Sequence, residues 1–129
     1  MNGAVKDGID SVQNLVDTNS SILEKLEEIN EDLLAHKFSR KDCVVALGGG
    51  VVGDLAGYVA ASYMRGIDFI QIPTTTLSQI DSSIGGKVAI NLDEVKNIVG
   101  AFYQPKMVFI DPETLHTPPR RHYINGLME

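Results

Sequence analysis

Three consecutive glycines directly after a short apolar run are the feature that most constrains how this chain can fold. Cys43-Val44-Val45-Ala46-Leu47 is continuous, apolar and rich in β-branched residues, which predicts a buried strand of a parallel sheet. Gly48-Gly49-Gly50 ends that run, and residues 51–64 then mix large side chains with glycine and alanine. A face of small residues lets a helix pack closely on a sheet. We therefore predict a strand, a glycine loop and a helix in succession.

The other apolar runs extend this unit into a larger α/β domain. The predicted elements are a helix from about Ser20 to Lys37 that opens with a Ser21/Glu24 capping box, a strand at 68–72, a short helix at 74–80, a glycine-rich loop at 82–87, a hairpin arm at 87–91, a strand at 107–110, one helical turn at 112–115 and a helix from Arg120. This alternation predicts a three-layer, Rossmann-like α/β fold with a mostly parallel sheet. Residues 1 to about 20 are weakly patterned, and we expect an atypical or poorly ordered N-terminus there.

Composition restricts the possible partners. The 129 residues are 43% hydrophobic, which is enough for one domain with a core. The net charge of −6 and the lack of a basic stripe argue against nucleic acid as a partner, although a few cations in one cleft could still bind a small anion.

The single cysteine, Cys43, has no partner for an internal disulfide and is expected to be a buried thiol. No apolar stretch approaches the ~20 residues of a membrane span, and no signal peptide is visible, so we expect a cytoplasmic protein without membrane association.

The glycine loop is a candidate nucleotide site. Glycines at the carboxyl end of a strand let the backbone approach a phosphate, and the free N–H groups that begin the next helix favour the same anion. The spacing is not G-x-G-x-x-G, and the same glycines are also compatible with a simple tight turn. Asp54, which we place in the first turn of the helix, either complements the helix dipole or accepts a hydrogen bond from a ribose or amide group.

A second candidate site is the hydroxyl-rich and glycine-rich loop that ends at Lys87. A lysine directly after Gly85-Gly86 in an acidic chain suggests an anion site, and Lys96-Asn97 follows nine residues later. The loop lacks the spacing of a P-loop. Either lysine alone is equally explained as an exposed surface charge.

Taken together, these segments resemble the 3-dehydroquinate synthase family. The blocks that carry the resemblance, in family order and spacing, are Val45 to Gly57, Tyr63 to Gly66, Gln71 to Thr75, Gln79 to Lys87, Lys96 to Pro105 and Asn125 to Glu129. The resemblance implies a Rossmann-like domain that is cut off, at Glu129, before the helical C-terminal domain. It also implies a homodimer.

Site residues follow from the resemblance, position by position. The positions that match NAD contacts are Gly50, Val51, Val52, Gly53, Asp54, Thr74, Thr75, Lys87, Lys96, Thr114, Leu115, His116 and Thr117. Asp81 matches an acid on the substrate hydroxyls, whereas Lys87 and Asn97 match groups at the substrate phosphate. Arg65 matches an arginine that reaches that phosphate from the neighbouring subunit, and Glu129 matches the first of three metal ligands, the other two being histidines.

The implied reaction converts 3-deoxy-arabino-heptulosonate 7-phosphate, a phosphorylated keto-sugar acid, to 3-dehydroquinate and phosphate in the shikimate pathway. A ring carbinol is oxidised by NAD while zinc or cobalt polarises its oxygen. The ketone acidifies the neighbouring carbon, so phosphate leaves by β-elimination, and the hydride is then returned. The carbon chain recloses as a carbocycle.

The chain departs from the family pattern in several places. Residues 16–21 do not match the family's segment before the first helix, Val95 stands where the family has glycine, and Pro118-Pro119 stands where it has Leu-Pro. His116 and His122 are six residues apart, which suits neither helical ligand spacing, so they and His36 are expected at the surface. Two further hypotheses therefore stay open: another sugar-phosphate cyclase, such as a 2-deoxy-scyllo-inosose synthase, and a non-catalytic nucleotide-binding module.

Overall fold

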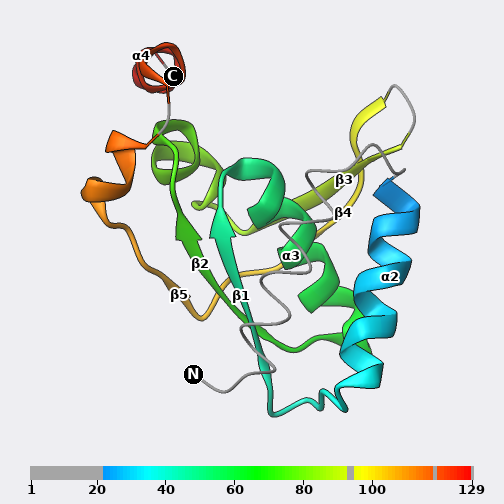
Figure 1. The fold of residues 1–129 in the computed structure, drawn as a ribbon. Helices are drawn as coiled ribbons and strands as arrows, with labels where there is room; N and C mark the ends of the chain where they lie inside the picture. The colour runs from blue at the N-terminus through cyan, green and yellow to red at the C-terminus, as the bar shows by residue number, and fades with distance from the viewer. Residues whose placement is uncertain (1–21, 93–94, 118, 129) are drawn as a thin grey trace.

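A three-stranded parallel sheet forms one side of the fold in the computed structural model, which describes residues 22–92, 95–117 and 119–128 (Figure 1). Its strand order is β1 (Cys43–Gly48), β2 (Asp68–Pro73) and β5 (Met107–Val108). Strands β1 and β2 pair in register, from Cys43 opposite Asp68 to Gly48 opposite Pro73. The carboxyl ends of both strands therefore meet at one edge of the sheet. The predicted α/β class and the parallel sheet are confirmed.

Strand β5 is shorter than the predicted 107–110. The Phe109 amide still donates to the Gln71 carbonyl at 2.8 Å, but Ile110 has left the sheet. The cause is local: Asp111 accepts a hydrogen bond from the Glu113 amide and begins the 3-10 helix η3 (Pro112–His116), which turns the chain away.

Helix α3 (Gly50–Ser62) connects β1 to β2 and lies between the parallel sheet and a hairpin (Figure 1). Leu55, Val59 and Ala60 are almost completely buried, as the small-residue pattern predicted. The 3-10 helix η1 (Tyr63–Arg65) follows directly. One expectation is wrong: the first turn of α3 is Gly50–Gly53, so Asp54 lies just beyond it and cannot be explained as a charge in the first turn.

The hairpin forms a layer on the other side of α3. It pairs β3 (Lys87–Leu92) with β4 (Val95–Phe102) in antiparallel fashion, with an irregularity between Ile90 and Leu92. Tyr103, directly after β4, stacks on Phe69 of β2 with ring centroids 5.7 Å apart, and its hydroxyl donates to the Ile67 carbonyl at 2.7 Å. These two contacts fasten the end of the hairpin to the sheet.

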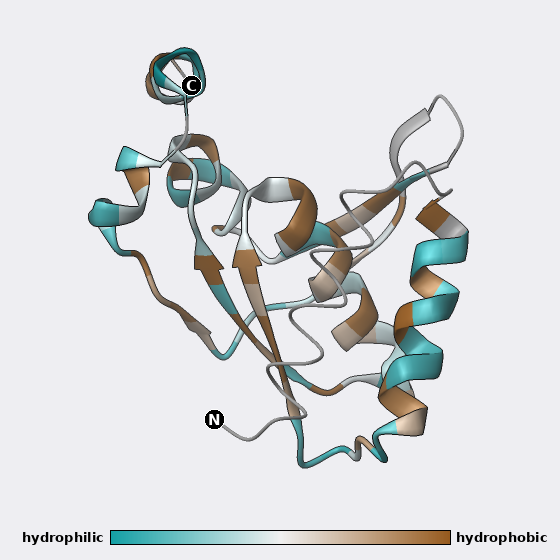
Figure 2. Cartoon of the chain, in the orientation of Figure 1, coloured by the Kyte–Doolittle hydropathy of each residue, from teal (hydrophilic) through white to brown (hydrophobic). Residues whose placement is uncertain are grey.

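Helix α2 (Ile22–Ala35) covers the edge of this assembly with the amphipathic pattern expected of it (Figure 2). Ile29 and Leu33 are buried against the core, whereas Glu27, Glu28 and Glu31 are exposed and Asp32 is half-buried. Leu34, expected on the apolar face, is exposed instead. The Ser21/Glu24 capping box involves a residue outside the described part of the chain.

Two short helices lie outside the sheet and the hairpin. The predicted helix at 74–80 ends as a π-helix, η2 (Ser78–Ser82), and the C-terminal helix is α4 (Arg120–Leu127). Cys43 is half-buried rather than buried, and the pKa of its thiol is raised by burial and by the nearby charge of Asp68. No helix in the described ranges is long and apolar enough to cross a membrane.

Candidate functional site

Side chains on the glycine loop would be crowded by neighbouring residues. A Cβ atom on Gly49 would lie 3.2 Å from Thr75 Cγ2, one on Gly50 would lie 3.1 Å from Ser82 Oγ, and one on Gly53 would lie 3.1 Å from Gln71 Nε2. The segment after β2 lies directly against this loop, and the Thr74 amide donates a hydrogen bond to the Gly48 carbonyl at 2.9 Å. These glycines therefore bring the backbone at the start of α3 to an open edge of the sheet, as predicted for a phosphate-binding loop.

Buried polar atoms without a hydrogen-bond partner in the described structure surround the same loop. They include Gln71 Oε1, Ser82 Oγ and Ser83 Oγ, and all three residues line a small space against Gly48, Gly49 and Gly50. Buried polar atoms are normally satisfied. The two hydroxyls can donate to an anion, as can the free amides at the start of α3. The donors around the glycine loop thus match the chemistry of an anion.

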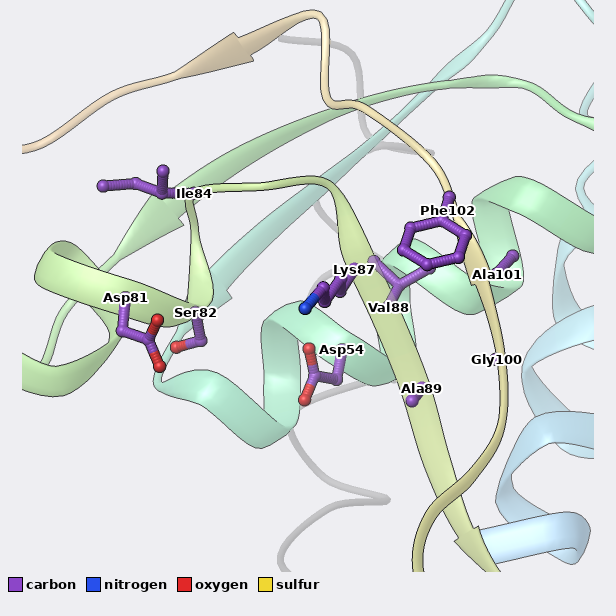
Figure 3. Close-up of a pocket in the computed structure, with 10 residues that line it drawn as sticks. All are labelled: Asp54, Asp81, Ser82, Ile84, Lys87, Val88, Ala89, Gly100, Ala101 and Phe102. Atoms are coloured by element: carbon purple, nitrogen blue, oxygen red, sulfur yellow. The ribbon is translucent and has the colours of Figure 1, made fainter.

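A larger pocket of about 460 Å³ lies next to the loop, between α3, η2 and the hairpin (Figure 3). Three charged residues line it: Asp54 from α3, Asp81 from η2 and Lys87 from the start of β3. The other lining residues are Ser82 of η2, Ile84 in the loop before the hairpin, and five residues of the hairpin itself: Val88, Ala89, Gly100, Ala101 and Phe102. A pocket with few polar groups on an otherwise apolar lining is typical of a small-molecule site.

Burial in this pocket affects the carboxyl group of Asp54. The side chain is half-buried, and desolvation raises the pKa of its carboxyl to about 6. Desolvation of an ionised carboxylate costs folding free energy. Groups whose pKa is shifted in this way are common at functional sites. Lys87 and Asp81, by contrast, are exposed.

The threonines after β2 form a compact turn beside the glycine loop. Thr75 Oγ1 and Ser78 Oγ are 2.7 Å apart, the Thr75 amide donates to Ser78 Oγ at 3.1 Å, and the Ser78 amide donates to Thr75 Oγ1 at 3.2 Å. This reciprocal arrangement holds the start of η2 against the carboxyl end of β2. Thr74 is half-buried in the same turn.

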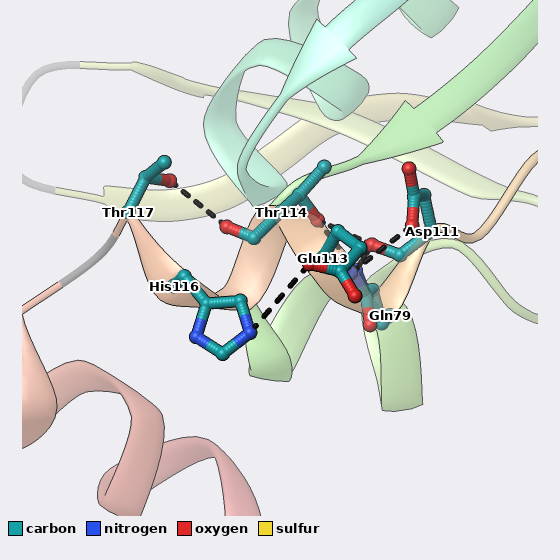
Figure 4. A network of polar contacts seen from close by, with 6 residues as sticks. All are labelled: Gln79, Asp111, Glu113, Thr114, His116 and Thr117. Atoms are coloured by element: carbon teal, nitrogen blue, oxygen red, sulfur yellow. Dashed lines mark hydrogen bonds and ion pairs between the residues drawn. The ribbon is translucent and has the colours of Figure 1, made fainter.

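The segment Thr114–Thr117 lies in and just after η3, next to η2 (Figure 4). Thr114 Oγ1 accepts a hydrogen bond from Gln79 Nε2 at 3.0 Å, and Thr117 Oγ1 donates to the Thr114 carbonyl at 2.9 Å. Leu115 is half-buried, whereas His116 is exposed, with its Nε2 3.7 Å from Glu113 Oε2. The structure thus brings this predicted segment to the same edge of the sheet as the glycine loop.

The remaining predicted site residues are not among the side chains that surround the glycine loop and the larger pocket. Val51 is exposed, but the side chain of Val52 belongs to the core, so only its backbone is available to a ligand. Arg65 is exposed at the far end of α3, roughly 20 Å from Gly50 at the rise of a helix of this length. Lys96 and Asn97 lie on β4, but their side chains are outside the described structure, and Glu129 is outside it altogether.

Within the described ranges, no three His, Cys, Asp or Glu side chains converge as a metal site would require. His36, His116 and His122 are exposed, as predicted. Sequence reasoning missed the buried Gln71 and Gln79 as parts of the site. The glutamine within the apolar run Asp68–Pro73 was a usable signal, because a polar side chain in a buried strand needs a reason to be there.

Comparison with known proteins gives one consistent family. The model of the 3-dehydroquinate synthase N-terminal family matches residues 13–125. The 3-dehydroquinate synthase of Thermoanaerobacter pseudethanolicus is 56% identical over 110 residues, which is 85% of this chain and 31% of the relative. That of Caldanaerobacter subterraneus subsp. tengcongensis is 58% identical over 110 residues, with the same coverage. The chain therefore spans about a third of the length of the curated relatives it matches.

Solved structures agree with this assignment. A 2-deoxy-scyllo-inosose synthase complexed with carbaglucose-6-phosphate, NAD+ and Co2+ superposes with a TM-score of 0.78 at 38% identity, over 81% of this chain and 29% of that one. A 2-epi-5-epi-valiolone synthase from Streptomyces hygroscopicus subsp. jinggangensis, with NAD+ and Zn2+ bound, gives 0.78 at 37% identity over the same shares. The glycine loop, the neighbouring pocket and the family match over residues 13–125 thus agree, and the chain belongs to the 3-dehydroquinate synthase N-terminal family.

Proposed function

We propose that this chain forms the NAD-binding part of a 3-dehydroquinate synthase, together with one wall of its substrate site. The enzyme would convert 3-deoxy-arabino-heptulosonate 7-phosphate to 3-dehydroquinate and phosphate. The observation that carries the proposal is the position of Gly50. A Cβ atom at this position would lie 3.1 Å from Ser82 Oγ, so a side chain there would be crowded at the start of a helix, beside a pocket that contains Asp54.

The nucleotide would be held by groups at the carboxyl edge of the sheet. Backbone amides of Gly50 to Val52, together with the Ser82 and Ser83 hydroxyls, would donate to the pyrophosphate. Thr74 and Thr75 on one side, and Thr114 to Thr117 on the other, would contact the rest of the nucleotide. When bound, NAD supplies a transient hydride acceptor and is not consumed.

Asp54 would orient the reactive end of the nucleotide. Its carboxyl, with a pKa of about 6, is mostly ionised at neutral pH and can accept a hydrogen bond from a ribose hydroxyl or a carboxamide. Because the residue is half-buried in a largely apolar pocket, that hydrogen bond is stronger than it would be in water. Binding of such a donor would in turn stabilise the ionised carboxylate.

Substrate would enter the larger pocket. Lys87 is positioned to bind the phosphate as a cation, and Asp81 to accept hydrogen bonds from substrate hydroxyls. Asn97 would add a contact to the phosphate. Holding the leaving phosphate and the ring in fixed positions favours β-elimination, since geometry supplies much of the rate of such a step. Arg65, at the far end of α3, would serve the phosphate site of the neighbouring subunit in a homodimer.

Glu129 is our proposed ligand for a divalent metal, zinc or cobalt, as in the cyclases with Zn2+ or Co2+ bound. The described side chains do not themselves assemble a metal site. We therefore assign no step of the reaction to the metal.

A related cyclase activity is the second candidate, because a 2-deoxy-scyllo-inosose synthase shares the fold at 38% identity. The 3-dehydroquinate synthases are more similar, at 56% and 58% identity, and so favour the first. A non-catalytic nucleotide-binding module would share the NAD site and would differ by showing no turnover even when it is joined to the rest of a cyclase.

Titration calorimetry with NAD tests the proposed site. The 129-residue protein should bind NAD, and Gly50→Val should weaken binding at least tenfold, because its side chain would displace Ser82 and fill the approach to the loop. Ala35→Val, which adds similar bulk at the exposed end of α2, is the matched control. If Gly50→Val binds NAD as tightly as the parent, the proposed nucleotide site is wrong.

A further inference from the structure

The Gln79 side-chain amide joins three segments that are distant in sequence. Its Nε2 lies 3.1 Å from the Pro73 carbonyl at the end of β2, 3.3 Å from the Asp111 carbonyl before η3, and 3.0 Å from Thr114 Oγ1 within η3 (Figure 4). Gln79 itself belongs to η2 and is only 9% exposed. One buried amide therefore connects the sheet edge, the π-helix and the 3-10 helix.

The chemistry of these contacts requires a donor at position 79. Both backbone partners are carbonyl oxygens, which only accept. The Thr114 hydroxyl already donates its proton to the Asp111 carbonyl at 2.7 Å, so it faces Gln79 as an acceptor too. An amide NH2 group has two protons for these three acceptors, and a carboxylate or an aliphatic side chain has none.

The two helices that Gln79 connects carry different parts of the proposed site. Two residues after Gln79, η2 presents Asp81 and then Ser82 to the pockets beside the glycine loop. On the other side, η3 carries the segment Thr114–Thr117. A π-helix is rare and is found mostly at functional sites, because its extra residue redirects side chains. The hydrogen bonds from Gln79 to the Asp111 carbonyl and to Thr114 Oγ1 join η2 directly to η3.

We propose that Gln79 is a positioning residue that sets the spacing between the Asp81–Ser82 side and the Thr114–Thr117 side of the nucleotide site. Gln79 does not touch the ligand in this arrangement; it acts through Thr114. The inference rests on the proposed NAD site. It predicts that losing the Gln79 amide raises the dissociation constant for NAD while the protein remains folded.

The test combines two variants with one control. Gln79→Leu keeps most of the volume and removes both donors, and Thr114→Val removes the acceptor while keeping the shape. Thr114→Ser retains the hydroxyl that accepts from Gln79 Nε2, so it should bind NAD more tightly than Thr114→Val. Ser62→Ala is the control, since it deletes a hydroxyl that donates to the Tyr58 carbonyl at 2.8 Å at the far end of α3. For each protein, the NAD dissociation constant is measured by calorimetry below the melting temperature.

We expect Gln79→Leu and Thr114→Val each to weaken NAD binding about tenfold, in line with the loss of one or two hydrogen bonds. The double variant should be little worse than either single one, because both remove the same link. Thr114→Ser should bind NAD more tightly than Thr114→Val, and Ser62→Ala should bind like the parent. A lower melting temperature with an unchanged dissociation constant in both Gln79→Leu and Thr114→Val would show a merely structural role and overturn the inference.

A second measurement separates this inference from the proposed function. Amide hydrogen exchange, measured by NMR without NAD, reports on η3 directly. Gln79→Leu should speed exchange at the Thr114 and Thr117 amides, which donate to the Asp111 and Thr114 carbonyls. If the parent does not bind NAD, the proposed function fails while this measurement still decides whether Gln79 positions η3. Unchanged exchange in both Gln79→Leu and Thr114→Val overturns the positioning role.

Discussion

A Cβ atom on Gly57 would overlap the side chain of Val88, so helix α3 and strand β3 are in contact at the closest distance a glycine permits. Val88 is buried, and it also lines the pocket next to Asp54. Gly57 lies three residues after Asp54 on the same helix, one turn further along. This contact therefore sets the distance between the two walls of the candidate site.

We expect Gly57→Ala to lower the free energy of unfolding by about 1–3 kcal/mol, because overpacking a closed contact forces side chains and backbone to shift. Urea denaturation measures the change. Val88→Ala should relieve part of it, so the double variant should be less destabilised than the sum of the two single changes. Strict additivity would show that Gly57 and Val88 are not in the close contact described.

Asp54→Asn should stabilise the protein in a pH-dependent way. Burial raises the pKa of the Asp54 carboxyl from 3.8 to about 6, so the folded protein holds its proton more tightly than the unfolded chain. The parent accordingly loses stability as the pH rises from about 4 to about 6, and the loss persists above that range. The full shift corresponds to about 3 kcal/mol, but the half-exposed side chain is screened by solvent, and we expect a gain of about 1 kcal/mol at pH 7.5.

Thermal and urea unfolding of the parent and of Asp54→Asn at pH 4.5 and at pH 7.5 measure this gain. The gain should be clearly smaller at pH 4.5, because the carboxyl of the folded protein is then mostly neutral and only part of the stability loss has developed. An equal gain at both pH values would mean that packing, and not desolvation of the charge, distinguishes the two proteins. Bound NAD should shrink the gain at pH 7.5 if it donates a hydrogen bond to the carboxylate.

Tyr63→Phe should cost about 1–2 kcal/mol of folding free energy. The Tyr63 hydroxyl donates to the Phe38 carbonyl at 2.8 Å in a buried setting, joining the end of α3 to the segment after α2. Removal of the hydroxyl leaves that carbonyl buried without its partner, which costs more than the net value of an exposed hydrogen bond. Tyr123→Phe, on the exposed face of α4, is the control and should change stability by less than about 0.5 kcal/mol. Similar values for both variants would contradict the role of the buried bond.

The final prediction concerns turnover. The 129 residues span about a third of relatives named 3-dehydroquinate synthase, and catalysis needs metal, nicotinamide and substrate held in one closed site. We expect these residues alone to release no phosphate from the keto-sugar phosphate in the presence of NAD and zinc. Fusing them to the remaining two thirds of a relative should restore turnover, and Lys87→Ala in that fusion should abolish most of it. Robust turnover by the 129 residues alone would refute this expectation.

The local elements of this protein follow from its sequence because their causes are local. The apolar run 43–47 with its glycine stop predicted β1, and the small-residue pattern at 51–64 predicted α3. The boundaries were less accurate. Strand β5 ends early and Asp54 falls beyond the first turn, since capping by Asp111 and the exact start of α3 depend on hydrogen bonds that residue patterns do not specify.

The site, in contrast, required the tertiary structure. The family blocks indicated Asp54, Asp81 and Lys87 as functional residues, but only the packing of α3 against the hairpin brings them to one pocket. The role of Gln79 was not visible in the sequence, because a buried amide is recognised by the partners that surround it, and those of Gln79 lie up to 35 positions away. Sequence determines which groups are present, whereas long-range packing decides which of them meet, since the desolvation and hydrogen bonding of each group depend on neighbours from distant segments.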